Sequence, residues 1–199
     1  TIFVGNLPLS FAKRRNQLQK IFSSVGKIES TRIRNVAVKG VKLPPEQAGN
    51  QNLVKKVCAN TNQLDATVKQ SVCGYVVFCK QESVEDALKL NPLEIPDDDD
   101  DDTTGPRRTR HIRVDRATPC HDPARTVFVG NLCFTADEET LFRHFTTLLS
   151  SNNVVVENVR LVRDKESNLC KGFGYVLFHD KSAVAQALRC DGSVYMKRK

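Results

Sequence analysis

The chain has 199 residues, with 30 Lys or Arg against 23 Asp or Glu, and its formal net charge is +7. This length allows one or two domains, and no apolar stretch is long enough to span a membrane, so we expect no membrane partner. Seven cysteines occur without a C-x-x-C pair, which argues against a zinc site and a disulfide framework. A basic chain of this kind suits a polyanionic partner.

A short repeat fixes the architecture. The chain opens on T-I-F-V-G-N-L at 1–7, which recurs as T-V-F-V-G-N-L at 126–132. Each copy is followed by a helical pattern, further strands and a second helix. We therefore predict an α+β fold of two tandem ferredoxin-like domains with the order β-α-β-β-α-β. Each domain should be an antiparallel four-stranded sheet backed by two helices.

The first domain is expected at 1–116, with two interruptions. The one at about 35–71 holds five lysines and two acidic residues, which slightly favours a basic arm along a nucleic-acid backbone over a tolerated insertion. The one at about 91–110 contains six consecutive aspartates at 97–102, which we interpret as a solvated run rather than a phosphate mimic or a contact for a basic protein. The cluster Arg107, Arg108 and Arg110 is a better candidate for RNA contact.

A linker at 117–125 leads to the second domain at 126–199. No clear closing strand is visible before the chain stops, so the sequence predicts that this strand is truncated or disordered. The acidic residues Asp137, Glu138 and Glu139 stand at the start of a helical pattern, where the helix dipole favours negative charge. We interpret them as helix caps.

The octet Lys171–Phe178, K-G-F-G-Y-V-L-F, is the most informative motif. Phe173 and Tyr175 lie two positions apart on a predicted strand and therefore share one face. Two exposed rings on a sheet can stack unpaired bases, and Lys171 can meet a phosphate. The octet therefore predicts a nucleic-acid surface in the second domain.

The corresponding run in the first domain, Ser71–Phe78, is degenerate. Tyr75 is kept, but Cys73 replaces the middle ring, and Ser71 and Val72 replace the usual basic residue and glycine. One stacking partner and one phosphate contact are thus lost. Basic side chains on neighbouring strands could compensate; alternatively, this domain docks a protein and leaves RNA to its neighbour.

The predicted RNA-binding residues are the aromatic and basic side chains of the strand faces and adjoining loops: Phe128, Phe173, Tyr175, Lys171, Arg160, Arg163, Lys165, Phe3, Tyr75, Arg32, Arg34, His111 and Arg113. No P-loop, zinc signature or nucleophile elbow occurs, so we expect neither an enzyme nor a cofactor or metal site.

The repeated run resembles the second ribonucleoprotein motif of the RNA recognition motif (RRM), and Lys171–Phe178 resembles the first. The degenerate first domain, I-R-V-D at 112–115 and V-R-L-V-R-D-K at 159–165 further resemble the RNA-binding motif protein thirty-four / nucleolar protein twelve family. The acidic run 97–102 departs from that family's pattern. The resemblance implies a protein of the nucleus and nucleolus that binds single-stranded regions of precursor ribosomal RNA during large-subunit assembly, together with pre-ribosomal proteins. Two alternatives stay open: a messenger-RNA binder in splicing, stability or translation, and a scaffold whose RRMs bind peptides.

Overall fold

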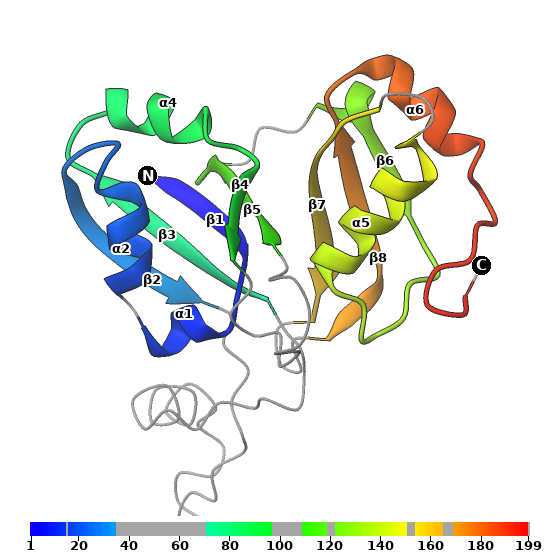
Figure 1. The fold of residues 1–199 in the computed structure, drawn as a ribbon, viewed down its shortest axis with the longest axis horizontal. Coiled ribbons are helices and arrows are strands. Elements are labelled where there is room, and N and C mark those ends of the chain that lie inside the picture. Colours follow the sequence, from blue (N-terminus) through cyan, green and yellow to red (C-terminus); the bar gives the residue numbers. More distant parts are fainter. Residues whose placement is uncertain are drawn as a thin grey trace, which may run out of the picture.

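The computed structural model describes residues 1–14, 16–34, 71–96, 109–118, 122–150, 154–164 and 169–198. In these ranges the chain forms two α+β domains, each with an antiparallel sheet and helices packed on one of its faces (Figure 1). The predicted α+β class, with two domains built on antiparallel sheets, is confirmed. Most of the first interruption, the acidic run 97–102, and Arg107, Arg108 and Lys165 lie outside the described residues.

The first domain contains a five-stranded sheet with the order β2-β3-β1-β5-β4. Its strands are β1 (Ile2–Leu7), β2 (Ile28–Arg34), β3 (Val72–Phe78), β4 (Leu93–Pro96) and β5 (Thr109–Arg116), and its helices are α1 (Ser10–Lys13), α2 (Asn16–Phe22) and α4 (Glu82–Leu88). Strand alternation turns Ile2 and Val4 of β1 and Ile112 and Val114 of β5 into the core, where they are almost fully buried.

Strand β4 was not expected, because it lies inside the segment that the sequence marked as an interruption. It pairs with β5 in the register Leu93↔Ile112 to Pro96↔Thr109. Ile95 is buried against the core, while Pro96, which has no N–H to donate, stands at the end of this edge strand. The interruption is therefore partly a hairpin that widens the first sheet.

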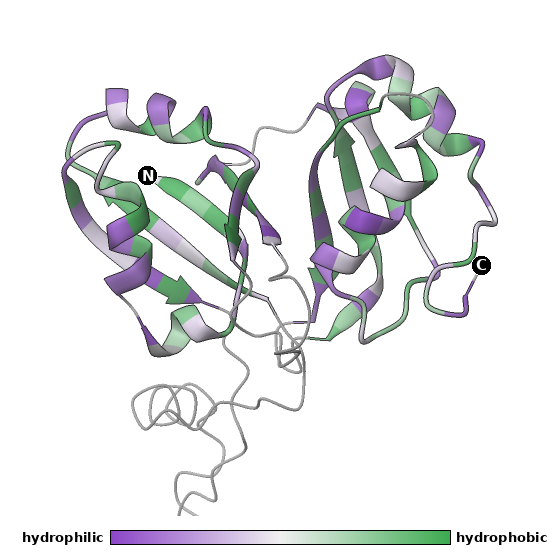
Figure 2. Ribbon diagram, in the orientation of Figure 1, coloured by the Kyte–Doolittle hydropathy of each residue, from purple (hydrophilic) through white to green (hydrophobic). Residues whose placement is uncertain are grey.

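The second domain contains β6 (Thr126–Val129), α5 (Glu138–Leu148), β7 (Val156–Arg163), β8 (Cys170–Phe178) and α6 (Lys181–Leu188), preceded by the 3-10 turn η2 (Pro123–Arg125). Its sheet order is β6-β8-β7, so the described residues supply three strands. The fourth, closing strand is the one that the sequence led us to expect as truncated or disordered. Near the end of this range, Tyr195 and Arg198 form an isolated bridge. Hydrophobic and hydrophilic residues alternate along α5, which buries Leu141 and Phe145 in the core (Figure 2).

Helix α5 begins with a side-chain cap. The carboxylate of Asp137 accepts a hydrogen bond from the backbone N–H of Glu139 at 3.1 Å, which satisfies one of the free donors of the first turn. The capping interpretation is correct for Asp137. The carboxylates of Glu138 and Glu139 have other partners, described below.

No helix in the described part of the chain has the length and apolar character needed to cross a bilayer.

Candidate nucleic-acid interface

Three aromatic rings form an open surface on the second sheet. Phe128 on β6 stands opposite Tyr175 on β8, and their ring centroids are 5.9 Å apart. Phe173 lies 5.7 Å from Phe128 and 6.4 Å from Tyr175, so the three rings form one cluster. The side chain of Phe128 is 61% exposed and that of Tyr175 is 38% exposed, which is high for large apolar groups. These rings can each receive a base.

The local backbone explains why the rings face outward. Val176 and Phe178 are fully buried on the opposite side of β8, and this fixes the face of the alternating partners. A Cβ atom on Gly174 would lie 2.8 Å from the carbonyl oxygen of Arg160, so only glycine fits there. Gly172 has a φ of 90°, which favours glycine, and its carbonyl accepts a hydrogen bond from the N–H of Leu132 at 2.8 Å. The glycines of the octet are thus structural.

Two cations border this aromatic surface. Lys171 is exposed at the start of β8, and Arg160 is exposed on β7 directly opposite Tyr175. An ammonium and a guanidinium beside stacked bases can contact the phosphates that link them. We call Phe128, Phe173, Tyr175, Lys171 and Arg160 the open platform.

The first sheet carries two rings in equivalent places, but arginines cover them. Phe3 and Tyr75 face each other across β1 and β3 with centroids 5.5 Å apart. The guanidinium of Arg113 lies 4.7 Å from the Phe3 ring centroid, and that of Arg32 lies 5.7 Å from the Tyr75 ring centroid. Both contacts are cation–π interactions, so a base must displace a guanidinium or stack on it. The sequence correctly placed Arg32 and Arg34 outward on β2, where both are exposed.

Two arginines that the sequence suggested as RNA contacts lie beside carboxylates instead of on the open platform. Arg163 does not join the open platform: its guanidinium donates to both carboxylate oxygens of Glu138 at 3.1 and 2.6 Å, and its side chain is 11% exposed. Arg110 is buried, and its Nη1 lies 3.8 Å from the Asp137 carboxylate. Both cations already neutralise buried carboxylates, so we remove them from the RNA-binding set.

His111 also has a structural partner. Its ring stacks on Phe142 of α5 with centroids 4.1 Å apart, and its Nδ1 lies 3.0 Å from Glu139 Oε1. Phe142 and Glu139 belong to the second domain. The predicted contact between His111 and RNA is thus replaced by a contact between the domains.

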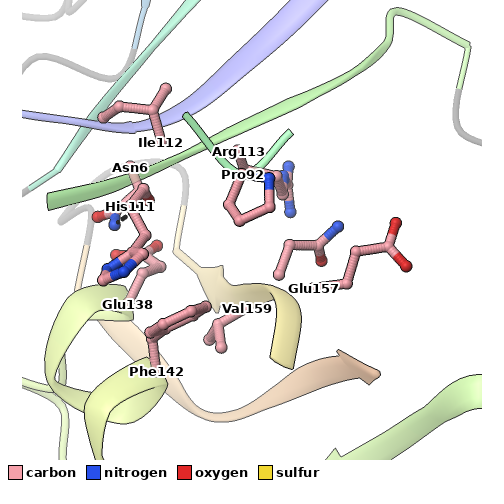
Figure 3. A pocket seen from close by; sticks show the side chains of 10 residues that line it. Asn6, Pro92, His111, Ile112, Arg113, Glu138, Phe142, Glu157 and Val159 are labelled. Carbon is pink, nitrogen blue, oxygen red and sulfur yellow. Dashed lines mark hydrogen bonds between the residues drawn. The ribbon is translucent and has the colours of Figure 1, made fainter. Parts of the chain in front are cut away.

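The first turn of α5 is held against the end of the first sheet by hydrogen bonds. Glu139 Oε2 accepts from the side-chain amide of Asn6 at 3.2 Å and from the backbone N–H of His111 at 2.9 Å. Glu138 Oε2 accepts from the hydroxyl of Ser71 at 2.7 Å. In Figure 3, Asn6 and His111 on the first domain lie beside Glu138 and Phe142 on α5, along a pocket between the domains. We call Asn6, Ser71, His111, Glu138 and Glu139 the domain clasp.

Sequence reasoning missed the domain clasp because acidic residues in a first helical turn have a sufficient local explanation. The sequence did contain one signal of further partners. It places three carboxylates at the start of α5, whereas a helix cap requires only one, which Asp137 provides.

The domain clasp changes the ionisation of its carboxylates. Burial alone would raise the pKa of Glu139, but hydrogen bonds from His111 and Arg143 outweigh it and lower this pKa from 4.5 to about 2. For Glu138, burial is likewise outweighed by the Arg163 guanidinium and the Ser71 hydroxyl, and the pKa is lowered. Burial and the neighbouring Glu138 raise the pKa of Asp137, with Arg110 acting in the opposite direction. Both clasp carboxylates are therefore ionised at neutral pH.

We expect a pH-dependent contribution from Glu139. Because its pKa is depressed in the folded protein, its stabilising effect is complete above pH 4.5 and is lost as the pH falls from there toward 2. The full effect is on the order of 3 kcal/mol. Urea unfolding of wild type and Glu139→Gln should show a gap in unfolding free energy at pH 7 that narrows below pH 4.5. Because Asp137 and Glu138 titrate in both chains, the difference between wild type and Glu139→Gln reports Glu139 alone. A gap in unfolding free energy that does not change with pH would contradict this prediction.

The region that carries the aromatic cluster is the one that matches a known protein family. Residues 127–199 match the family model of the RNA recognition motif. The whole chain is 36% identical over 200 residues to RNA-binding protein 34 of Homo sapiens, and it covers 40% of that protein. It is 32% identical over 193 residues to Nucleolar protein 12 of Candida albicans, with 94% of this chain and 36% of that protein covered. The chain thus spans well under half the length of these relatives.

Among solved structures, RNA recognition domains 1 and 2 of Sex-lethal from Drosophila melanogaster align with 96% of this chain and 93% of theirs, at 16% identity and a TM-score of 0.35.

Proposed function

We infer that this chain is a tandem RRM protein related to RNA-binding protein 34 and Nucleolar protein 12. We propose that it binds single-stranded regions of precursor ribosomal RNA during assembly of the large ribosomal subunit. RNA binding follows from the RRM itself, which is a binding module and not a class of enzyme. The RNA class and the stage of assembly are the proposed part.

The open platform is the observation that carries this proposal. Phe128 and Tyr175 are exposed, Phe173 is half-buried beside them, and the three rings form one aromatic cluster. Stacking is worth about 1–3 kcal/mol per base. Lys171 and Arg160 border the cluster and would neutralise the phosphates of a bound strand. Stacking accepts unpaired bases only, which favours single-stranded regions over duplex.

The first domain would have a secondary part in RNA binding. Arg32 and Arg34 are exposed on β2 and suit phosphate contacts, whereas Phe3 and Tyr75 are each covered by an arginine. We therefore assign base stacking to the second domain and backbone contacts to the first. The name Nucleolar protein 12 supports a nucleolar location, where precursor ribosomal RNA and pre-ribosomal proteins would be the partners.

Sequencing of RNA crosslinked to the protein in cells tests the RNA class. We expect reads concentrated on precursor ribosomal RNA, and a nucleolar signal for the tagged protein. Reads dominated by messenger RNA would favour a role in splicing, stability or translation instead. Absence of crosslinked RNA would support a peptide-binding scaffold. An open-platform variant, Phe173→Ala with Tyr175→Ala, serves as the matched control and should lose the specific reads.

A further inference from the structure

We propose that the first domain uses the place of its missing middle ring to hold the second domain, so that the degenerate motif Ser71–Phe78 is an internal docking site and the two domains form one fixed unit. The docking itself is independent of the RNA class, while its effect on RNA binding rests on the function proposed above.

The docking site lies where three strands of the first sheet end or begin together. Asn6 is near the end of β1, Ser71 directly precedes β3, and His111 is near the start of β5. The register Leu7↔Val72 and Gly5↔Arg113 places these strand ends side by side. The first turn of α5 meets all three through Glu138 and Glu139. The second domain therefore contacts the first across the width of its central strands.

The side chain at position 73 is covered on a face that is open in the second domain. Cys73 stands two residues before Tyr75, as Phe173 stands two residues before Tyr175. Cys73 is only 9% exposed, and Arg34, Arg113 and Glu138 all act electrostatically on its thiol, whose pKa burial raises to about 11. A phenylalanine side chain is much larger than a thiol and would need additional space at this buried position, close to the charges of Arg113, Glu138 and Arg34. Interiors are close-packed, so a ring here would force α5 away.

The second departure from the motif serves the same contact. Ser71 takes the place that Lys171 holds in the open platform, and its hydroxyl donates to Glu138 at 2.7 Å in a buried position. The short hydroxyl of Ser71 allows α5 to approach the strand closely, whereas a long lysine side chain at this position would hold the helix at a greater distance. Ser71 is thus hydrogen-bonded directly to the second domain, and the buried thiol of Cys73 lies within electrostatic range of the same Glu138 carboxylate.

The charges of the contact are balanced by side chains of both domains. The carboxylates of α5, Asp137, Glu138 and Glu139, have Arg110, Arg163 and Arg143 as cationic partners. Arg143 also donates to the carbonyl of Thr109 at 2.6 Å, which ties α5 to β5 once more. Buried polar groups must each find a partner, so this network favours one relative orientation of the domains over a loose association.

Docking has a consequence for the path of RNA. Strand β5 of the first sheet contacts β7 of the second, which carries Arg160 of the open platform (Figure 1). A strand that leaves the open platform past Arg160 would next meet the first sheet at β5, where Arg113 is paired with Asp115. Beyond β5 it would meet the exposed Arg32 and Arg34 of β2. In a fixed unit the contacts to both sheets are available without ordering the linker, which lowers the entropic cost of binding a long strand.

The test replaces Cys73 by Phe in the full chain, with Cys73→Ala as the control that adds no ring. Residual dipolar couplings report whether two domains share one alignment tensor. We expect one tensor for wild type and Cys73→Ala, and two for Cys73→Phe. If amide dispersion shows that Cys73→Phe unfolds the first domain, Glu139→Ala decides, because it breaks the clasp from the second domain; it should also give two tensors. One tensor for Glu139→Ala, or for a folded Cys73→Phe, would overturn the proposal.

RNA titrations supply the second readout. With Glu139→Ala we expect unchanged affinity for an oligonucleotide long enough for the open platform alone, and about tenfold weaker binding of one that reaches both sheets. Glu85→Ala is the control, since it removes an exposed carboxylate paired with Arg116 inside the first domain. Loss of an acidic group alone should strengthen RNA binding, because less negative charge repels the phosphates. A lower RNA affinity of Glu139→Ala would therefore be caused by the loss of the domain clasp. If Cys73→Phe binds RNA more tightly with one tensor retained, position 73 belongs to an RNA surface. The tensor result stands whichever RNA class the protein binds.

Discussion

Replacing Phe173 and Tyr175 together by Ala is expected to weaken binding of single-stranded RNA by roughly 30-fold or more, since each stacked base is worth about 1–3 kcal/mol. Both rings belong to the exposed aromatic cluster on β8 and have Phe128 as their common neighbour. Fluorescence anisotropy with a labelled oligonucleotide measures the change in Kd at one fixed salt concentration, because phosphate contacts make affinity depend on salt.

The fold should tolerate this double substitution. The core side of β8, with Val176 and Phe178, is unchanged, and Tyr175 is exposed. Phe173 is half-buried on the same open face, outside the core. We expect the melting temperature to shift by only a few degrees, since positions outside the core contribute little to stability, on the order of 0.5 kcal/mol each. Unchanged RNA affinity in a folded variant would refute the base-stacking role of the second domain.

Replacing Glu138 by Ala is expected to destabilise the protein by about 3–5 kcal/mol, because it leaves the guanidinium of Arg163 buried without its carboxylate. The two groups are held at 2.6 Å, and both side chains are 11% exposed. The same substitution removes the acceptor of the buried Ser71 hydroxyl. Urea unfolding of the full chain measures the loss.

A second substitution separates the lost ion pair from a lost contact. Arg163→Met in the Glu138→Ala background removes the guanidinium that has lost its main carboxylate partner. It should recover a large part of the stability, since the cost of a broken buried pair lies mainly in the charge left behind. If the double variant is as unstable as the two single losses added together, the pair is not coupled and the assigned cause is wrong.

The strands that carry the rings could be predicted from sequence because their alternation is unambiguous. Phe173 and Tyr175 alternate with Gly174 and Val176, so one register alone buries the apolar side. The T-[IV]-F-V-G-N-L repeat placed Phe3 and Phe128 on matching strands for the same reason. Strand β4 was missed because Leu93 and Ile95 offer only one alternation, too short a pattern to tell a strand from a loop.

The position of Arg163 was predicted wrongly although the sequence contained the correction. Strict alternation from the exposed Arg160 already puts position 163 on the helix-facing side of β7, where the structure finds it bound to Glu138. The partners that Glu138 and Glu139 have in the first domain could not be predicted in this way. A contact between two domains depends on their relative placement, and no local periodicity records that placement.

The division of work between the two sheets is tested most directly by removing two rings from each in turn. Phe173→Ala with Tyr175→Ala removes open rings, whereas Phe3→Ala with Tyr75→Ala removes rings covered by Arg113 and Arg32. Titrated with the same single-stranded RNA, the first variant should lose roughly 30-fold or more in affinity and the second only about threefold. Equal losses, or a larger loss for the variant of the first sheet, would contradict the assignment of base stacking to the second domain.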